Sequence, residues 1–240
     1  MPLRRRTTGK NGTSESVDNY LKAILSLGGA EGGRVTSKAL ADRLSVAPAS
    51  VTNMLQKLAL SGDTFVKYER HRGVELSASG RLRALEVLRH HRLIETFLYE
   101  VLDYPLEEVH EEAERLEHFI SERFEERIAA KLGHPRIDPH GHSIPSLEGE
   151  MPRQQSVPLS DVDAPASVVV ESLSDRDSGV LRLFQSYGIK PAVRLRVTKR
   201  AIEGSWVRVG RSRAEVELSR EVADDIRVVA ESVPAGAAAK

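Results

Sequence analysis

Residues 36–60 read TSKALADRLSVAPASVTNMLQKLAL, and this stretch decides the fold of the amino-terminal part of the chain. Thr36 can cap a short helix that runs to Leu44, because a threonine hydroxyl accepts a hydrogen bond from a free N–H of the first turn. Residues 45–48 then lead to a second helix that ends at about Leu60 and has an apolar inner face. Two short helices joined by a tight turn predict a helix-turn-helix.

The sequence on either side of this motif completes a small domain. Residues 16–27 carry apolar side chains at helical spacing and end at a pair of glycines, which predicts a preceding helix. Residues 65–76 contain two short apolar segments around a basic turn, which predicts a two-stranded wing. We therefore expect a winged helix-turn-helix over residues 1–76, with a basic arm at Arg4–Arg6.

The second helix of the motif carries short and polar side chains where a recognition helix faces the major groove. Asn53 and Gln56 can hydrogen-bond to base edges, and Ala49 can contact a thymine methyl group. Lysine, arginine and hydroxyl side chains nearby suit phosphates. The predicted DNA contacts are Lys38, Ala47, Ala49, Ser50, Thr52, Asn53, Gln56, Lys57, Arg70 and Arg72. The alternative is a winged helix that contacts protein rather than DNA.

The middle of the chain, residues 77–148, predicts two long helices. The first runs to about Leu102, and the second is expected as one continuous helix from Pro105 to about Leu132, since proline is accepted in a first helical turn. The second helix has an apolar face that includes Val109 and Ala113. Such a face on a helical pair needs a partner, which favours a second subunit.

The carboxyl-terminal part predicts a small β domain. Residues 149–165 are rich in Pro, Ser, Gln and Asp, which is typical of a linker. Over residues 166–233, five short segments with strand character surround one helix at 178–187, and an SH3-like barrel is the simplest arrangement. The fold class expected for the whole chain is mainly α with a small β domain.

Charge is distributed unevenly in a chain whose net formal charge is zero. Residues 1–92 hold 16 Lys and Arg against 8 Asp and Glu, whereas residues 93–150 hold 5 against 15. A basic block beside an acidic block suggests a polyanion-binding module joined to a cation-binding one. No run of about 20 apolar residues is present to span a bilayer, so we expect a cytoplasmic protein without a membrane partner.

Histidine and glutamate recur at helical spacing in the acidic block. His91 and Glu95 are one turn apart, and the pattern His-x-x-x-Glu-x-x-Glu-His occupies residues 110–118. On one helix, the second pattern would place two imidazoles and two carboxylates on one face. These nitrogen and oxygen donors suit Mn²⁺, Fe²⁺, Co²⁺ or Zn²⁺, and the absence of cysteine excludes a thiolate site. The alternative is a charged helix face exposed to solvent.

With these features, the chain resembles the diphtheria-toxin-repressor and manganese-transport-regulator family of metal-dependent transcriptional repressors. The resemblance rests on Val17-Asp-Asn-Tyr-Leu21, Ala49-Ser-Val-Thr52, Leu76-Ser-Ala-Ser-Gly80, His90-His-Arg-Leu-Ile-Glu95 and Val109-His-Glu-Glu-Ala-Glu-Arg-Leu-Glu-His118. It implies a winged helix-turn-helix, a helical metal-binding and dimerisation domain and an SH3-like domain. It also implies a homodimer that binds double-stranded operator DNA and has no small-molecule substrate.

The resemblance implies two metal sites. One is formed by His91, Glu95 and His110 and is completed in some members from the SH3-like domain, where Asp177 is the candidate and Asp175 a weaker one. The other site is the activating one and would connect the first helix of the winged domain to the dimerisation domain. Its residues would be Asn19, Glu114, Glu117 and His118.

The resemblance also bears on the choice of metal. Asn19 stands where manganese-type members have Asp and iron-type members have Met, and its amide oxygen can ligate a hard cation. Glu114 stands where iron-type members tend to have Cys, and replacing a soft thiolate by a carboxylate favours Mn²⁺, with Fe²⁺ as the alternative. Zn²⁺ or Co²⁺ can bind in vitro without being the physiological signal.

These observations predict a DNA-binding regulator, by resemblance a repressor of metal-uptake genes, in which Mn²⁺ or Fe²⁺ is the corepressor. One alternative is a metal-independent winged-helix module, and another is a carboxylate-type metalloenzyme. Catalysis is disfavoured because the stretch from His110 to Glu114 lacks the second histidine of the zinc-protease motif. A di-iron bundle would need carboxylates from four helices. We therefore expect no enzymatic activity.

Overall fold

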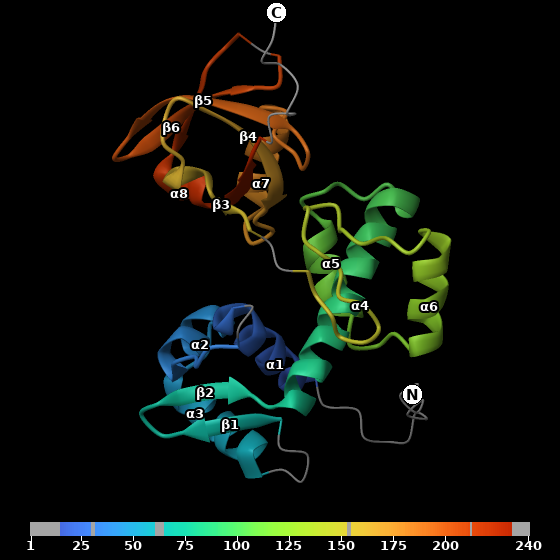
Figure 1. Ribbon diagram of the computed structural model, residues 1–240. Coiled ribbons are helices and arrows are strands. Elements are labelled where there is room, and N and C mark those ends of the chain that lie inside the picture. Colours follow the sequence, from blue (N-terminus) through green and yellow to red (C-terminus); the bar gives the residue numbers. More distant parts are fainter. Residues whose placement is uncertain (1–14, 30–31, 61–64, 153–154, 212, 232–240) are drawn as a thin grey trace, which may run out of the picture. The chain divides into compact units, whose positions relative to one another are not determined.

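The computed structural model of the chain divides into two compact units. The first contains residues 1–89 and 147–149, and the second contains residues 90–146 and 150–240. Figure 1 shows the helices and strands of both units. The described residues are 15–29, 32–60, 65–152, 155–211 and 213–231. The basic arm predicted at Arg4–Arg6 lies outside them. Within the described part of the chain, no helix has the length and apolar character needed to cross a membrane.

The first unit confirms the winged helix-turn-helix. Thr36 caps the second helix as predicted, since its Oγ1 accepts a hydrogen bond from the Ala39 N–H at 3.1 Å. Pro48 begins the third helix, where the missing N–H of proline has no partner to lose. The elements are α1 (Glu15–Gly28), α2 (Ser37–Leu44), α3 (Pro48–Leu60), β1 (Val66–Glu69) and β2 (Gly73–Leu76).

The wing is fastened to the segment that precedes α2. Val35 and Val74 exchange two backbone hydrogen bonds, with N to O distances of 2.8 and 2.9 Å. Gly73 has a φ of +89°, and a Cβ atom there would lie 2.4 Å from the carbonyl oxygen of Val35. Only glycine combines this backbone conformation with so close an approach, so the sequence at Gly73 sets where the wing turns.

Helix α4 (Ala78–Leu102) begins in the first unit and ends in the second. At its start, a Cβ atom on Gly80 would lie 1.9 Å from the carbonyl oxygen of Phe65, so glycine allows α4 to begin against the wing. Arg83 of α4 binds Asp18 of α1 through two contacts, of 2.6 and 2.9 Å. Asp18 is buried, and a two-point arginine–carboxylate contact fixes both side chains.

The single helix predicted from Pro105 to about Leu132 is wrong, because the structure has two helices there. Helix α5 (Val109–Leu116) ends before Glu117, and α6 (Glu122–Lys131) begins after Ser121. The Ser121 hydroxyl accepts a hydrogen bond from the N–H of Phe124 at 3.3 Å and so supplies an N-cap in the middle of the predicted helix. Glu117 and His118 therefore lie in a turn rather than on a helix face.

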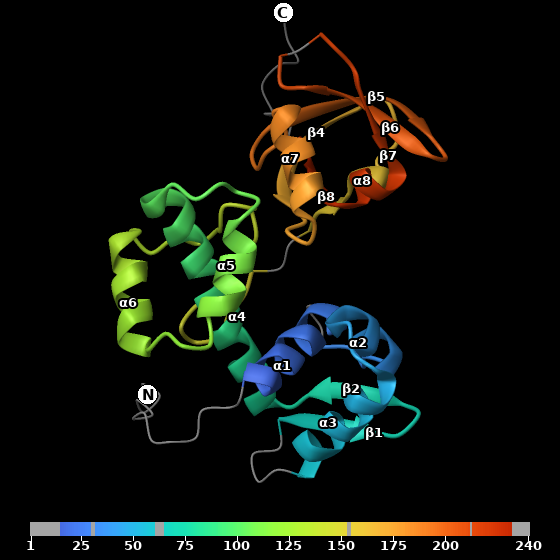
Figure 2. The same ribbon diagram turned by 180° about the vertical axis from the view of Figure 1, so that it is seen from behind.

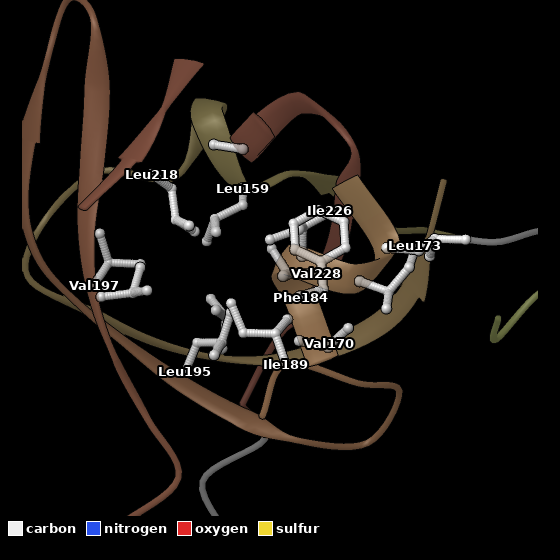
Figure 3. Close-up of a cluster of buried hydrophobic side chains, with 14 residues drawn as sticks. Leu159, Val170, Leu173, Phe184, Ile189, Leu195, Val197, Leu218, Ile226 and Val228 are labelled. Carbon is white, nitrogen blue, oxygen red and sulfur yellow. The ribbon is translucent and has the colours of Figure 1, made fainter. Parts of the chain in front are cut away.

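The second unit also contains the predicted β domain. Its six strands are antiparallel and lie in the order β3-β8-β4-β5-β6-β7. They are β3 (Val157–Pro158), β4 (Ala166–Leu173), β5 (Arg194–Ala201), β6 (Gly204–Val209), β7 (Val216–Ser219) and β8 (Ile226–Ala230). Between them lie the helices η1 (Leu159–Asp161), α7 (Ser178–Ser186) and α8 (Arg220–Asp224). Leu195 and Val197 point inward with Phe184 of α7 in a continuous apolar core (Figure 3).

The β domain begins earlier than the sequence predicted. Strand β3 pairs with β8 inside the segment 149–165 that was expected to be a linker. Leu159, which follows β3, is fully buried and points into the core shown in Figure 3. This segment is mostly polar, and only a few apolar residues in it make these contacts. Composition alone therefore places the start of the β domain too late in the chain.

Candidate metal centre

A buried cluster of histidines and carboxylates surrounds Glu95, which α4 carries one turn after His91. Glu95 Oε1 lies 2.8 Å from His91 Nε2 and 3.2 Å from His110 Nδ1. His110 comes from the first turn of α5, and its Nδ1 lies 3.5 Å from Asp175 Oδ2, from the segment between β4 and α7. One donor atom from each of these four residues lies close enough to the others to hold one cation.

The fourth residue of this cluster is Asp175 rather than Asp177, which the sequence favoured. Asp177 Oδ1 accepts hydrogen bonds from the N–H groups of Gly179 and Val180 and so caps α7. An aspartate that directly precedes a helix is a preferred N-cap. Its carboxylate is therefore occupied, whereas the Asp175 carboxylate faces His110.

The electrostatics of the cluster suit a cation. Burial alone would raise the pKa of Glu95, but the charge of His91 and hydrogen bonds from His110 and His91 hold that pKa well below its usual value. The second oxygen of Glu95, Oε2, is buried without a hydrogen-bond partner among the described residues. Because a buried carboxylate oxygen is costly without a partner, an ion bound there would satisfy it. The donor set therefore fits a divalent metal.

Two further residues of this region, Asp138 and His140, were missed by the sequence reasoning. His140 Nδ1 lies 3.8 Å from Glu95 Oε1, and the donor atoms of Glu95, Asp138 and His140 also lie close enough to share an ion. Burial would lower the pKa of His140, but the nearby negative charge of Glu95 raises it, with help from Asp138 and Asp175. The signal in the sequence was Asp-x-His-x-His at residues 138–142.

A second group of donors lies on the other side of the His91 ring. His91 Nδ1 is 2.6 Å from Glu117 Oε2, and one donor atom each of His91, Glu114 and Glu117 could hold an ion. His118 Nε2 lies 3.3 Å from Glu117 Oε1. The His91 ring thus separates two carboxylates, Glu95 and Glu117, both of which are buried. The structure therefore brings together Glu114, Glu117 and His118, although through a turn rather than one helix face.

Asn19, the other residue predicted for the activating site, lies on α1 in the first unit. Its Oδ1 atom is buried and has no hydrogen-bond partner among the described residues. The residue lines an open pocket together with Tyr20, Leu44 and Val46. An unsatisfied amide oxygen at this position can accept a metal bond. Its joint role with Glu114, Glu117 and His118 stays a prediction.

The predicted recognition helix presents its polar face to solvent. Val51, Leu55 and Leu58 are the buried side of α3, and the predicted contacts on the other side are exposed. Thr52 is half-buried, and its hydroxyl donates a hydrogen bond to the carbonyl of Pro48 at 3.2 Å. In the wing, Arg72 forms an ion pair with Glu69 at 3.0 Å. The exposed set is Lys38, Ala47, Ala49, Ser50, Asn53, Gln56, Lys57, Arg70 and Arg72.

Family models match three parts of the chain. The model of the iron dependent repressor, N-terminal DNA binding domain, matches residues 12–74, and that of its metal binding and dimerisation domain matches residues 77–146. The FeoA domain model matches residues 157–230, which agrees with the observed start of the barrel at β3.

Two similar proteins match most of this chain and most of their own length. The iron-dependent repressor IdeR of Mycobacterium tuberculosis (strain ATCC 25618 / H37Rv) is 33% identical over 76% of this chain and 84% of its own. A solved manganese-dependent transcriptional repressor in complex with manganese is 38% identical, with a TM-score of 0.82 over 89% of this chain and 99% of its own. The chain belongs to the family of metal-dependent, DNA-binding transcriptional repressors.

Two further similar proteins are less alike in sequence. The structure of the manganese regulator SloR is 28% identical, with a TM-score of 0.73 over 90% of this chain and 98% of its own. The diphtheria toxin repressor of Corynebacterium diphtheriae is 28% identical over 66% of both chains. The likeness therefore extends through the barrel as well as the winged and helical parts.

Replacing Asp175 by Asn should weaken the binding of one Mn²⁺ ion per chain by at least about tenfold. Removing a residue that only hydrogen-bonds to a metal ligand already lowers metal affinity by about tenfold or more, and a direct ligand should matter at least as much. Asp177→Asn should leave Mn²⁺ binding unchanged, since asparagine also caps a helix. Equilibrium dialysis of both variants against Mn²⁺ measures the difference. Loss of an ion in Asp177→Asn alone would show that the barrel donor is Asp177.

Proposed function

We propose that this repressor is activated by Mn²⁺, which acts as its corepressor on operator DNA. The observation that carries the proposal is the position of His91 between Glu95 and Glu117, with only nitrogen and oxygen donors around it. Hard carboxylate donors with one or two imidazoles favour Mn²⁺ over softer ions. The similarity to a manganese-dependent repressor, at 38% identity, supports the same metal. The similarity to IdeR keeps Fe²⁺ as the second candidate.

In this proposal the residues of the chain have distinct roles. A bound Mn²⁺ supplies positive charge among carboxylates that would otherwise repel each other. His91, Glu95, His110 and Asp175 hold one ion and attach the barrel to the helical part. Glu114, Glu117 and His118 hold the activating ion with Asn19. The second set would fix α1, and with it the recognition helix, in the DNA-binding arrangement. Since binding is reciprocal, operator DNA raises metal affinity by the same factor.

The partner in this proposal is double-stranded operator DNA in the cytoplasm, upstream of metal-uptake genes. The recognition helix α3 presents Asn53, Gln56 and Lys57 on one exposed face. Short side chains such as Ala49 and Ser50 at its start allow close approach to the groove. The family members act as repressors, and the proposal includes no catalytic step.

The chain is proposed to act as a homodimer through its helical part. Large apolar side chains are exposed at the end of α4, at the end of α5 and near the start of α6, and Phe119 is 77% exposed. Such a concentration of exposed apolar side chains marks a protein contact. Others in this set are Tyr99, Val101, Leu102, Leu116 and Phe124. The matching family model, which describes this region as a dimerisation domain, supports a second copy as the partner.

Replacing Glu117 by Gln should abolish the increase in DNA affinity on adding Mn²⁺, which for an allosteric coupling of ordinary size is about 5- to 150-fold. The amide keeps the shape of the side chain but removes the charge that the metal binds. Glu126→Gln is the matched control, because Glu126 is an exposed acid on α6 with the same charge change. Fluorescence anisotropy with genomic duplex fragments at fixed salt measures the affinity, with chelator as the metal-free state.

Either of two results would contradict this proposal. Glu117→Gln could still respond to Mn²⁺ like the unmodified chain, which would remove Glu117 from the activating site. Chelator could leave DNA binding of the unmodified chain unchanged, which would make the histidine–glutamate cluster structural. Comparison of Mn²⁺ with anaerobic Fe²⁺ in the same assay decides between the two metals.

Asn53→Ala and Arg70→Ala should affect DNA binding in different ways. Loss of Asn53 should change which bases are preferred, by about 1–3 kcal/mol at one position, because its amide can hydrogen-bond to a base edge. Loss of Arg70 should weaken binding to all sequences and lower its salt dependence by about one unit of slope, because the wing meets phosphates. Selection from randomised duplexes, followed by salt titration, measures both. Unchanged base preference in Asn53→Ala would remove α3 as the reading helix.

Phe119→Glu should convert the dimer to a monomer, because a charge would be buried in an apolar interface. Ile202→Glu is the control, since Ile202 is also a largely exposed apolar residue, at 86%, but lies in the turn between β5 and β6 of the barrel. Sedimentation equilibrium should give twice the chain mass of 26.5 kDa for the unmodified chain and for Ile202→Glu. A single-chain mass for the unmodified protein in the presence of Mn²⁺ would exclude the homodimer.

A further inference from the structure

The β5–β6 hairpin of the barrel carries a concentration of positive charge that the recognition helix and the metal sites do not explain. Residues 190–215 contain eight Lys and Arg but only two Glu. The rest of residues 151–240 contains six Lys and Arg against ten Asp and Glu, so the remainder is acidic. The small positive charge of the whole carboxyl-terminal part therefore comes entirely from this one hairpin and its flanks.

The pleat of the two strands places these cations on one face. Leu195, Val197 and Val207 are buried in the barrel core, and Figure 3 shows Leu195 and Val197 pointing into it. Because side chains alternate along a strand, Arg194, Arg196 and Arg208 project from the opposite face. The register pairs Arg196 with Arg208 and Lys199 with Trp206. We call this set the hairpin face: Arg194, Arg196, Lys199, Trp206 and Arg208.

The hairpin face holds like charges against each other. Arg196 and Arg208 are directly opposite on neighbouring strands, an arrangement that destabilises a sheet. Arg208 is relieved by an ion pair with Glu215 at 3.1 Å, and Arg194 by one with Glu231. Among the described residues, Arg196 and Lys199 have no acidic side chain within ion-pair distance. A polyanion lying on this face would supply the missing negative charge.

The aromatic member of the face, Trp206, is the only tryptophan in the chain. It is half-buried, and Lys199 Nζ lies 4.5 Å from the centre of its ring. This cation–π contact keeps the Lys199 side chain on the outer face of the sheet. Several cations gathered on one exposed face attract a polyanion such as the phosphate backbone of DNA.

We propose that the hairpin face binds the phosphate backbone of duplex DNA, as a second contact that does not read sequence. The proposal rests on the proposed function, because it takes the partner of the barrel to be the DNA that the winged helix-turn-helix binds. Duplex DNA is favoured over an acidic protein because the winged domain of the same chain would bind DNA. The barrel would then meet this DNA at a high effective concentration. Regularly spaced phosphates can face Arg196 and Lys199 together, and neutralise the repulsion between Arg196 and Arg208.

Trp206 allows a direct test in the full-length, Mn²⁺-loaded protein. Titration with a fluorescein-labelled genomic duplex should change Trp206 emission over the same concentration range as the anisotropy of the label. Arg196→Glu should suppress the emission change, weaken DNA binding by roughly three- to tenfold at 0.1 M salt and lower the salt-dependence slope by about one.

The control is Arg182→Glu, which makes the same charge change at an exposed residue of α7. Figure 2 shows α7 and the β5–β6 hairpin on opposite sides of the barrel. This variant should match the unmodified protein in emission, affinity and salt dependence. Equal losses in both variants would mean that only net charge matters, and would overturn the proposal.

The remaining outcomes separate this proposal from the proposed function. Anisotropy that reports Mn²⁺-dependent DNA binding while Trp206 emission and Arg196→Glu stay unchanged would overturn the hairpin contact alone. A change of Trp206 emission with polyglutamate but not with DNA would assign the face to an acidic protein instead. Absence of any DNA binding in the presence of metal would overturn the proposed function, and the DNA contact of the hairpin with it.

Discussion

The contact of His91 with two buried carboxylates is the interaction on which the helical part of this repressor depends. Its two ring nitrogens lie 2.6 Å from Glu117 and 2.8 Å from Glu95, and so join α4 to the turn that follows α5. Buried carboxylates destabilise a fold unless positive charge accompanies them. A cation bound among these donors would supply that charge, and its binding would then contribute to the stability of this part of the fold. Metal occupancy and the packing of α4 against α5 are thereby coupled.

The parts of the fold that local sequence determines could be predicted, and the parts that depend on distant contacts could not. The helix-turn-helix follows from the Thr36 cap and the spacing of apolar residues, all within 25 residues. The break between α5 and α6 was not predicted, because apolar residues keep helical spacing across it, from Val109 to Phe124. Its local signal is the N-cap residue Ser121. The early start of the barrel was not predicted, because β3 pairs with β8, which lies far along the chain.

In the candidate metal site, too, local contacts could be predicted from the sequence and distant ones could not. Helical spacing identified His91 with Glu95 and His110 with Glu114, because each pair lies one turn apart. The donor from the barrel depends on how a loop packs against α5, and spacing cannot choose between Asp175 and Asp177. A local signal was available, since an aspartate directly before a helix is a natural N-cap, and Asp177 does cap α7. The contribution of Asp138 and His140 depends on a loop that returns to Glu95, which no periodicity predicts.

Long-range attraction between the acidic middle block and its metal ions cannot by itself control DNA binding. At physiological salt, charges more than about 8–10 Å apart are largely screened when they are exposed. Control must therefore pass through contacts, and α4 provides a continuous element for it. Arg83 of α4 binds the buried Asp18 of α1, the neighbour of Asn19, and His91 lies eight residues further along the same helix. In the proposed mechanism, an ion bound at His91 would act on α4, the helix that also contacts α1, the first helix of the DNA-binding domain.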